Sequence, residues 1–269
     1  MVKPFKTGKE PFVPDDRDLR FSKYLKPGGG ALASVGKVIT PPIIPPPPEP
    51  VGNYKLVDRW QMLGNDRVGN CVIAGALHLV KLWSASTNRT LNLTEQLAIN
   101  IYSEFTGYDP SNPATDRGAN MRSFLKHWLA TGLPDGDGGN HKIGAYVLLD
   151  PGDLEQLRAA IYLFGGVFTG VWLPEEAMEA FIKRQPWTVY PDDLNPGGGH
   201  CIIYGGKDIV YNYAVTWGDV HPTDDAFYKQ YNEESYAVIS PDMINDKGVT
   251  LEGFDLEQLR ADLAYVKTL

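Results

Sequence analysis

The sequence predicts an α+β protein in which a helical half is followed by a strand-rich half. Up to about residue 150, apolar residues recur at helical spacing in three segments, 70–84, 93–105 and 119–131. Beyond that point, short runs rich in Val, Ile, Tyr and Phe predict strands at 166–172, 200–206, 208–215 and 235–240, with helices at 153–163 and 174–182. This order is typical of a helical lobe packed against a small antiparallel β-barrel lobe.

The first 56 residues predict an extended N-terminal arm without a core of its own. They are rich in Pro and Gly, including a glycine run at 28–30 and a proline run at 41–50, and proline fixes φ and removes a hydrogen-bond donor. Such a segment offers too little apolar surface to offset its ordering entropy. We therefore expect an arm at 1–56 and a folded domain at 57–269, mainly helical over 57–150 and mainly β over 151–269. The arm is either a spacer on the surface or a docking segment for a protein partner.

Composition and charge narrow the class of protein. Hydrophobic residues make up 43% of the chain, and 25 basic against 33 acidic side chains give a net charge of −8. Without a basic stripe to neutralise phosphates, we expect no nucleic-acid partner. Only Cys71 and Cys201 are cysteines, which favours a reducing compartment. We see no signal peptide and no membrane-spanning run, so we expect a cytoplasmic protein, or one assembled into a particle, without a membrane partner.

The run LGNDRVGNC (63–71) is the strongest candidate for a catalytic loop. It is rich in turn-forming residues and places Cys71 in the first turn of an apolar helix. The partial positive charge of a helix N-terminus stabilises a thiolate, which is the nucleophilic form of cysteine. Such a nucleophile needs a base and oxyanion donors. His200 is the candidate base, and Asn65 together with the Cys71 backbone amide are the candidate donors. The alternative interpretation of Cys71 is an inert core cysteine.

Several motifs, in this order, resemble those of papain-like cysteine peptidases. Asn65 stands where the family has a glutamine, six residues before the nucleophile, and Gly69 matches a glycine two residues before it. The run LTEQ (93–96) is similar to the element that opens the family's next helix, with Thr94 as an N-cap. A glycine-led helix closed by Gly132 follows, and His200 begins a strand. The resemblance, from about residue 57 onward, implies a papain-like two-lobe fold and a Cys71–His200 dyad acting on a peptide or protein substrate.

The chain departs from this family at the third catalytic residue. The family's Asn-Ser-Trp-Gly run corresponds here to VTWG (215–218), and Val215 has no side chain that can hydrogen-bond an imidazole. Asp219 and Asn212 are the candidates to orient the histidine instead, although by strand alternation Asn212 does so only across a bulge. The resemblance gives Trp217 the role of shielding the histidine, and an ordinary core tryptophan is the alternative.

The remaining conspicuous residues suggest no cofactor. The glycines preceding His200 are followed by a strand and so do not form a phosphate loop. Gly69 and Gly199 are candidates for a substrate cleft, since a glycine at 199 lets a peptide backbone pass close to His200. His127 and His141 lack partners at metal-ligand spacing and His221 precedes a proline in a loop, so we expect no metal site. We expect His78 to pack or to point to solvent.

Two classes of function fit these observations. The first is a cysteine peptidase or a related acyl-transfer enzyme. The second is a papain-fold protein that has lost its chemistry and serves as a structural or binding component, for example of a phage or another assembly. The Val215 departure and the Pro-rich arm favour the second class, whereas the agreement around Cys71 and His200 favours the first.

Overall fold

The computed structural model describes residues 5–25, 48–191 and 197–240. The glycine run at 28–30 and the proline run up to residue 47 lie outside the described residues. Within the described part, the helices are α1 (Cys71–Ser86), α2 (Glu95–Thr106), α3 (Met121–Thr131), α4 (Leu154–Phe164), α5 (Glu175–Ile182) and α6 (Asp225–Tyr231). The strands are β1 (Val51–Gly52), β2 (Leu133–Pro134), β3 (Asn140–His141), β4 (Ala145–Leu148), β5 (Val167–Leu173), β6 (Gly198–Lys207), β7 (Asn212–Thr216), β8 (Asp219–Thr223) and β9 (Asn232–Ile239).

One antiparallel sheet organises the strand-rich half. Its strands follow the order β4-β9-β5-β6-β7-β8, and β1 pairs with the far end of β6. Among the described residues these pairings follow an open path, and they do not close the small barrel expected from the sequence. The strand β4 precedes residue 150 but pairs with β9, so the sheet takes one strand from the predicted helical half.

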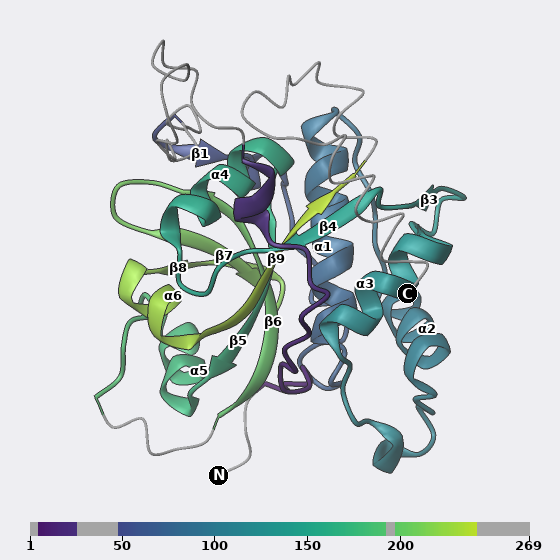
Figure 1. Cartoon of the computed structure of the whole chain (residues 1–269). Helices are drawn as coiled ribbons and strands as arrows, with labels where there is room; N and C mark the ends of the chain where they lie inside the picture. Colours follow the sequence, from purple (N-terminus) through teal and green to yellow (C-terminus); the bar gives the residue numbers. More distant parts are fainter. Residues whose placement is uncertain (1–4, 26–47, 192–196, 241–269) are drawn as a thin grey trace.

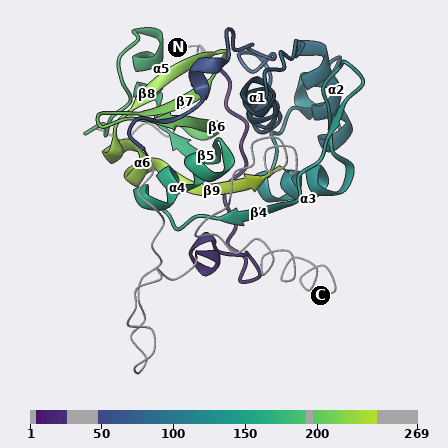
Figure 2. The ribbon, with the colours of Figure 1, turned by 90° about the horizontal axis from the view of Figure 1, so that it is seen from above.

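The sheet lies between two apolar cores. One face packs against α1, α2 and α3 through side chains such as Phe168 and Ile203. The opposite face packs against α4, α5 and α6 through their neighbours, such as Val167 and Ile202, because successive side chains of a strand point to opposite faces. Figures 1 and 2 show the two sides of this arrangement, with α1 to α3 on one side of the strands. The predicted α+β architecture with a helical lobe against a β lobe is therefore confirmed.

The predicted helices begin and end close to the expected positions. Helix α1 begins at Cys71 and is buried over most of its surface, as its nearly continuous apolar sequence predicts. The Thr94 side chain accepts a hydrogen bond from the Leu97 amide, which confirms the predicted N-cap of α2. Gly132 ends α3 with a positive φ of 84°. The elements missed from sequence are short ones, β1 to β4 and α6, and the strand β8, which contains Pro222.

The N-terminal segment (residues 5–25) is extended but packs into the domain. Figure 1 shows it, in purple, running between the helical half and the sheet. Isolated parallel bridges join Lys9 to Ala119 and Arg20 to Leu148. Phe21 and Tyr24 then form a short 3-10 helix, and both side chains are fully buried in the core beneath α4. The segment therefore adds apolar side chains to the domain core.

Replacing Phe21 with alanine is expected to lower the free energy of unfolding by about 3–5 kcal/mol, because it removes a fully buried ring from a packed core. Chemical denaturation of the full chain measures this change. Val13→Ala is the matched control, since Val13 is on the same segment and 63% exposed, and it should change stability by less than about 0.5 kcal/mol. A Phe21→Ala effect as small as that of the control would mean that the segment is peripheral to the fold.

Candidate active site

Cys71 is the first residue of α1 and lies beneath a tightly turned loop. Leu63 and Gly64 both have positive φ angles, 57° and 75°, and the Asn70 side-chain amide donates to the Leu63 carbonyl at 2.9 Å. These contacts fold the run 63–71 back on itself, so that the helix starts at the cysteine. The Cys71 side chain is fully buried, and both cysteines are free thiols.

His200 lies on β6, which packs against α1. Its Nε2 is 2.7 Å from the hydroxyl oxygen of Thr216 on β7, and its ring stacks on Trp217 with centroids 4.4 Å apart. The other ring nitrogen, Nδ1, is buried and makes no hydrogen bond among the described residues. In the tautomer in which Nε2–H donates to Thr216, Nδ1 therefore keeps a free lone pair. The predicted contact between Trp217 and the histidine is present.

The residue that hydrogen-bonds the imidazole is Thr216. Neither Asn212 nor Asp219, the two residues expected from the sequence, contacts the His200 ring among the described contacts. The Asn212 side chain donates to Asp225 at 3.0 Å, near the opposite end of β7. The Asp219 carboxylate is half-exposed and lies 3.4 Å from Arg184. Asn212 matches the family's asparagine in chemistry, and Asp219 matches Val215 in strand parity, but the sequence signal for the contact is the hydroxyl of Thr216, directly before Trp217.

Asn65 belongs to the same loop as Cys71, and its side-chain amide is directed at the backbone of that loop. It is 2% exposed, and its amide nitrogen lies 3.4 Å from the Val68 carbonyl, a long hydrogen bond. This contact keeps Asn65 within the turn that leads to the nucleophile. Its action as an oxyanion donor remains a prediction.

The N-terminal segment crosses this site at Gly8. The Gly8 and Lys9 amides donate to the Gly199 carbonyl at 3.2 and 2.8 Å, and the Ala119 amide donates to the Gly8 carbonyl at 2.8 Å. A Cβ on Gly8 would lie 2.0 Å from the carbonyl oxygen of Gly69. Gly8 is therefore held between Gly69, in the loop before Cys71, and Gly199, the residue before His200. The two predicted cleft glycines, Gly69 and Gly199, both contact a peptide backbone.

Side chains on either side of Gly8 fix the segment in place. The Phe5 ring stacks on Trp217 with centroids 4.5 Å apart, on an indole that also stacks with His200. The Lys6 ammonium lies 2.5 Å from the Asp116 carboxylate, which also accepts the Gly69 amide. The segment therefore covers the histidine, the cysteine loop and the space between them.

Burial favours the neutral forms of Cys71 and His200. Burial raises the pKa of the Cys71 thiol to about 11, although hydrogen bonds from the Cys201, Gly8 and Val72 amides lower it in part. Burial also lowers the pKa of His200 to about 3. A cysteine nucleophile needs its thiolate, and this arrangement favours the neutral thiol of Cys71.

The other histidines have structural contacts. His78 bonds to the Gln61 carbonyl at 2.8 Å and packs edge-on against Trp60, and burial lowers its pKa to about 4. His141 lies 3.1 Å from the buried Asp135 carboxylate. Within residues 5–25, 48–191 and 197–240, no group of three or more His, Cys, Asp or Glu side chains could hold a metal ion. No helix in these ranges is long and apolar enough to cross a membrane.

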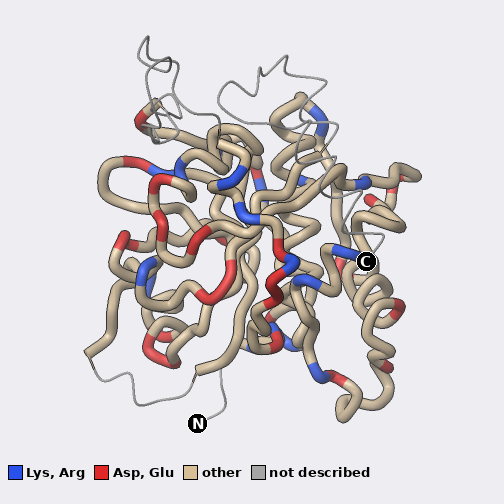
Figure 3. Tube along the Cα trace, in the orientation of Figure 1, with Lys and Arg blue, Asp and Glu red and all other residues tan. Residues whose placement is uncertain are grey.

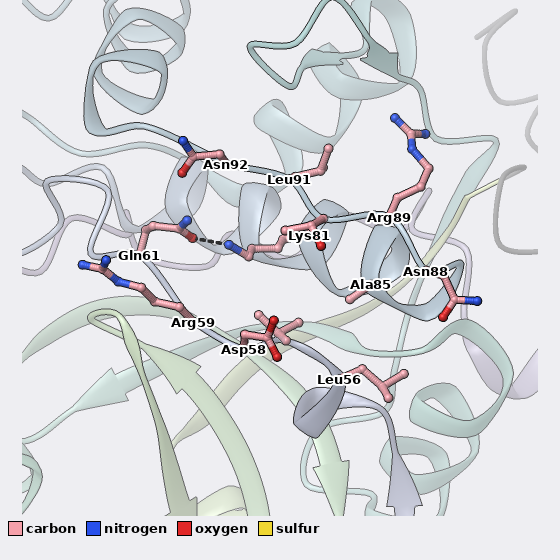
Figure 4. A pocket seen from close by; sticks show the side chains of 12 residues that line it. Leu56, Asp58, Arg59, Gln61, Lys81, Ala85, Asn88, Arg89, Leu91 and Asn92 are labelled. Carbon is pink, nitrogen blue, oxygen red and sulfur yellow. Dashed lines mark hydrogen bonds between the residues drawn. The ribbon is translucent and has the colours of Figure 1, made fainter.

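A separate pocket of about 510 Å³ lies beside the later turns of α1 (Figure 4). Within it the Lys81 ammonium donates to the Gln61 side chain at 2.6 Å. Lys81 is ten residues after Cys71, which corresponds to about 15 Å along a helix. Acidic and basic positions are mixed along the chain trace (Figure 3). Because Cys71 does not line this pocket, it is distinct from the candidate active site.

Comparison of structures identifies the fold. The chain is similar to xylellain, a cysteine protease from Xylella fastidiosa, with a TM-score of 0.59 and 15% identity over 88% of this chain and 97% of that chain. The chain has a papain-like fold. A procathepsin B from Trypanosoma congolense (TM-score 0.53, 10% identity, covering 88% and 86%) and a structure from work on the mite allergens Blo t 1 and Der p 1 (0.51, 14%, 81% and 76%) share this papain-like fold.

The papain-like fold is evident from structure and not from sequence comparison. No family model matches the sequence. No curated protein matches it either. The identities of 10 to 15% concern the fold alone, so the chemistry of this papain-like chain must be argued from its own residues.

Proposed function

We propose that this protein is a cysteine peptidase, or a related acyl-transfer enzyme, that uses Cys71 and His200. The observation that carries the proposal is the N-terminal segment, whose backbone at Gly8 already lies between Gly69 and Gly199. Around Gly8, four main-chain hydrogen bonds join an extended backbone to Gly199 and Ala119, and the Gly8 amide is close enough to Cys71 to lower the pKa of its thiol. A site that binds an extended backbone beside a nucleophile is suited to cleaving a peptide bond.

The residues divide the chemistry among them. With the cleft open, His200 Nδ1 takes the thiol proton, and the Cys71 sulfur attacks the substrate carbonyl carbon. The Asn65 side-chain amide and the Cys71 backbone amide donate to the resulting oxyanion. The imidazolium then protonates the leaving amine, and the C–N bond breaks to leave an acyl-cysteine. Water, deprotonated by His200, hydrolyses the thioester and restores the thiol. Thr216 is a positioning residue that holds the imidazole from its Nε2 side.

The alternative is a protein that keeps the fold and has lost the chemistry, as a structural or binding component of an assembly such as a phage particle. One observation favours it: Cys71 and His200 are both fully buried and neutral under the N-terminal segment. On this alternative the segment is a permanent part of the core, and displacing it produces no activity.

Hydrolysis by an open form of the full chain separates these proposals. Gly8→Ala opens the cleft, because the added Cβ cannot fit against the Gly69 carbonyl. We expect Gly8→Ala to cleave an unfolded protein such as casein, with products identified by mass spectrometry, and Gly8→Ala with Cys71→Ala to leave it intact. Absence of cleavage by a folded Gly8→Ala protein with an accessible Cys71 would favour the structural alternative.

Asn65→Ala, introduced into the Gly8→Ala chain, is expected to lower kcat by about 10²–10³-fold, because one oxyanion donor is lost. The matched control is Asn92→Ala, which removes the same group at an exposed position outside the site. Steady-state hydrolysis of a fluorogenic peptide gives both values. If kcat stays unchanged in Asn65→Ala, the donor is another group of the loop.

A further inference from the structure

The Lys9 side chain occupies a buried acidic pocket beside Gly8. Its ammonium lies 2.9 Å from Glu233 Oε2 and 3.1 Å from Glu234 Oε1, and it donates to the Glu10 carbonyl at 2.8 Å. The Lys9 side chain is fully buried, and that of Glu234 is 1% exposed. Lys9 is the residue next to the one that covers Cys71, so this pocket lies immediately beside the proposed reaction centre.

The pocket is shaped for a long unbranched side chain. Its floor is Gly170 on β5, which pairs with Cys201 on β6 and with Glu234 on β9. A Cβ on Gly170 would lie 2.6 Å from both Cδ and Cε of Lys9, so the glycine makes room for the aliphatic chain. The Tyr236 hydroxyl donates to Glu234 Oε2 at 2.8 Å, which leaves Oε1 directed at the ammonium.

A cation is the group that this pocket stabilises. Burying an ammonium is unfavourable unless it is paired, and the buried Glu234 carboxylate repels the neighbouring Glu233 carboxylate, which is 26% exposed, unless a cation lies between them. Burial lowers the pKa of Lys9, but the charges of Glu234 and Glu233 outweigh it and raise that pKa overall. A neutral side chain of equal length would leave both carboxylates without their counter-charge.

We propose that this pocket selects a lysine or arginine side chain in the substrate, next to the residue that lies over Cys71. The N-terminal segment occupies the substrate's track, and Lys9 fills the position of the selected side chain. Glu234 and Glu233 are the specificity-determining residues, and Gly170 admits the chain. The proposal rests on the proposed peptidase function, because a substrate backbone must follow the same track past Gly199 and Ala119.

The first test uses the full-length Gly8→Ala chain and a set of peptides that place Lys, Arg, Met or Glu at each position around the scissile bond. We expect kcat/KM for Lys or Arg to exceed that for Met by about 30-fold or more at one position, the effect of a buried charge pair. Glu234→Gln should remove most of this preference, and Glu104→Gln, an exposed control on α2, should not. Cleavage without a basic preference, or a preference that survives Glu234→Gln, would overturn the pocket and leave the peptidase function standing.

A second test needs no turnover. Lys9→Met in the full chain should loosen the segment and raise the rate at which iodoacetamide modifies Cys71, followed by mass spectrometry, by about 10-fold or more, since a buried charge pair is broken. Adding Glu234→Gln should reverse part of this rise, because one of the two unpaired carboxylates is then neutral. Asp16→Asn, at an exposed position of the same segment, is the control. An unchanged rate in Lys9→Met would show that the pocket does not require a cation and would overturn the proposal, whereas failure of hydrolysis alone would contradict only the peptidase function.

Discussion

Gly8→Ala is expected to raise the rate at which Cys71 reacts with iodoacetamide near neutral pH by about 100-fold or more. Two effects act in the same direction. The added Cβ would lie 2.0 Å from a backbone oxygen, so the segment must leave the cleft and expose the thiol. Exposure also removes the burial that raises the pKa of Cys71 to about 11. At pH 7.5, a return to the ordinary cysteine pKa of about 8.5 alone increases the thiolate fraction by about 300-fold.

The dependence of this reaction on pH gives an independent check. Only the thiolate reacts, so the rate rises with pH until the pKa of Cys71 is passed. For the unmodified chain, the rate should keep rising toward pH 11, since burial holds the pKa of that thiol at about 11. In Gly8→Ala the rise should level off at a lower pH. Burial lowers the pKa of His200 to about 3, and exposure in Gly8→Ala should raise that pKa again. The imidazolium can then form and stabilise the thiolate, so the rate should level off at a still lower pH.

Gly138→Ala is the matched control, because nothing lies within 4 Å of a Cβ placed there, although its φ of 91° carries some strain. That variant should react like the unmodified chain. Equal labelling rates in Gly8→Ala and Gly138→Ala, with both proteins folded, would mean that the segment tolerates the added atom and that Gly8 does not keep Cys71 buried.

The position of Cys71 at the start of a helix could be predicted from sequence, because it depends on the residues directly around it. Turn-forming residues followed by an apolar helical pattern place Cys71 at the start of α1, and the structure begins the helix at that residue.

The docking of the N-terminal segment could not be predicted, because it depends on main-chain groups far away in sequence. Gly8 and Lys9 bond to the backbone of Gly199 and Ala119, and a main-chain hydrogen bond leaves no mark in the side-chain pattern of either partner. The pairing of Lys9 with Glu234 joins residues 225 positions apart. Among the 33 acidic side chains, nothing in the sequence distinguishes the two that face this lysine.

The residue that hydrogen-bonds His200 could not be predicted from sequence, for a different reason. Sequence comparison looks for the same residue type at the same position, and Val215 breaks that match. The structure places Val215 in the core shared with α1 and brings the next residue, Thr216, to the histidine. A hydroxyl can accept a hydrogen bond from Nε2–H much as a carboxamide does. The imidazole of His200 therefore has a hydrogen-bond acceptor at Nε2, although the residue type and the sequence position differ from those of the family.

Thr216→Val, in the Gly8→Ala chain, is expected to lower kcat/KM by about 10³-fold or more, as when the residue that fixes a catalytic imidazole is removed. Valine keeps the shape of threonine, but it cannot accept the hydrogen bond that His200 Nε2–H donates to Thr216. The ring can then adopt the tautomer that carries its proton on Nδ1, the nitrogen that must receive the thiol proton. Hydrolysis of the same fluorogenic peptide measures the loss, and Thr216→Ser, which keeps the hydroxyl, should recover most of the activity.

A structural role for Thr216 makes a different prediction. If the hydroxyl served only packing or stability, Thr216→Val would shift the melting temperature and leave the pH profile of kcat/KM unchanged in position. If it positions His200, the limb of the profile that reports the histidine should move, because the imidazolium loses the acceptor that stabilises it and its pKa falls. A fully active Thr216→Val enzyme would assign the orientation of His200 to Trp217, whose indole ring already stacks on the imidazole.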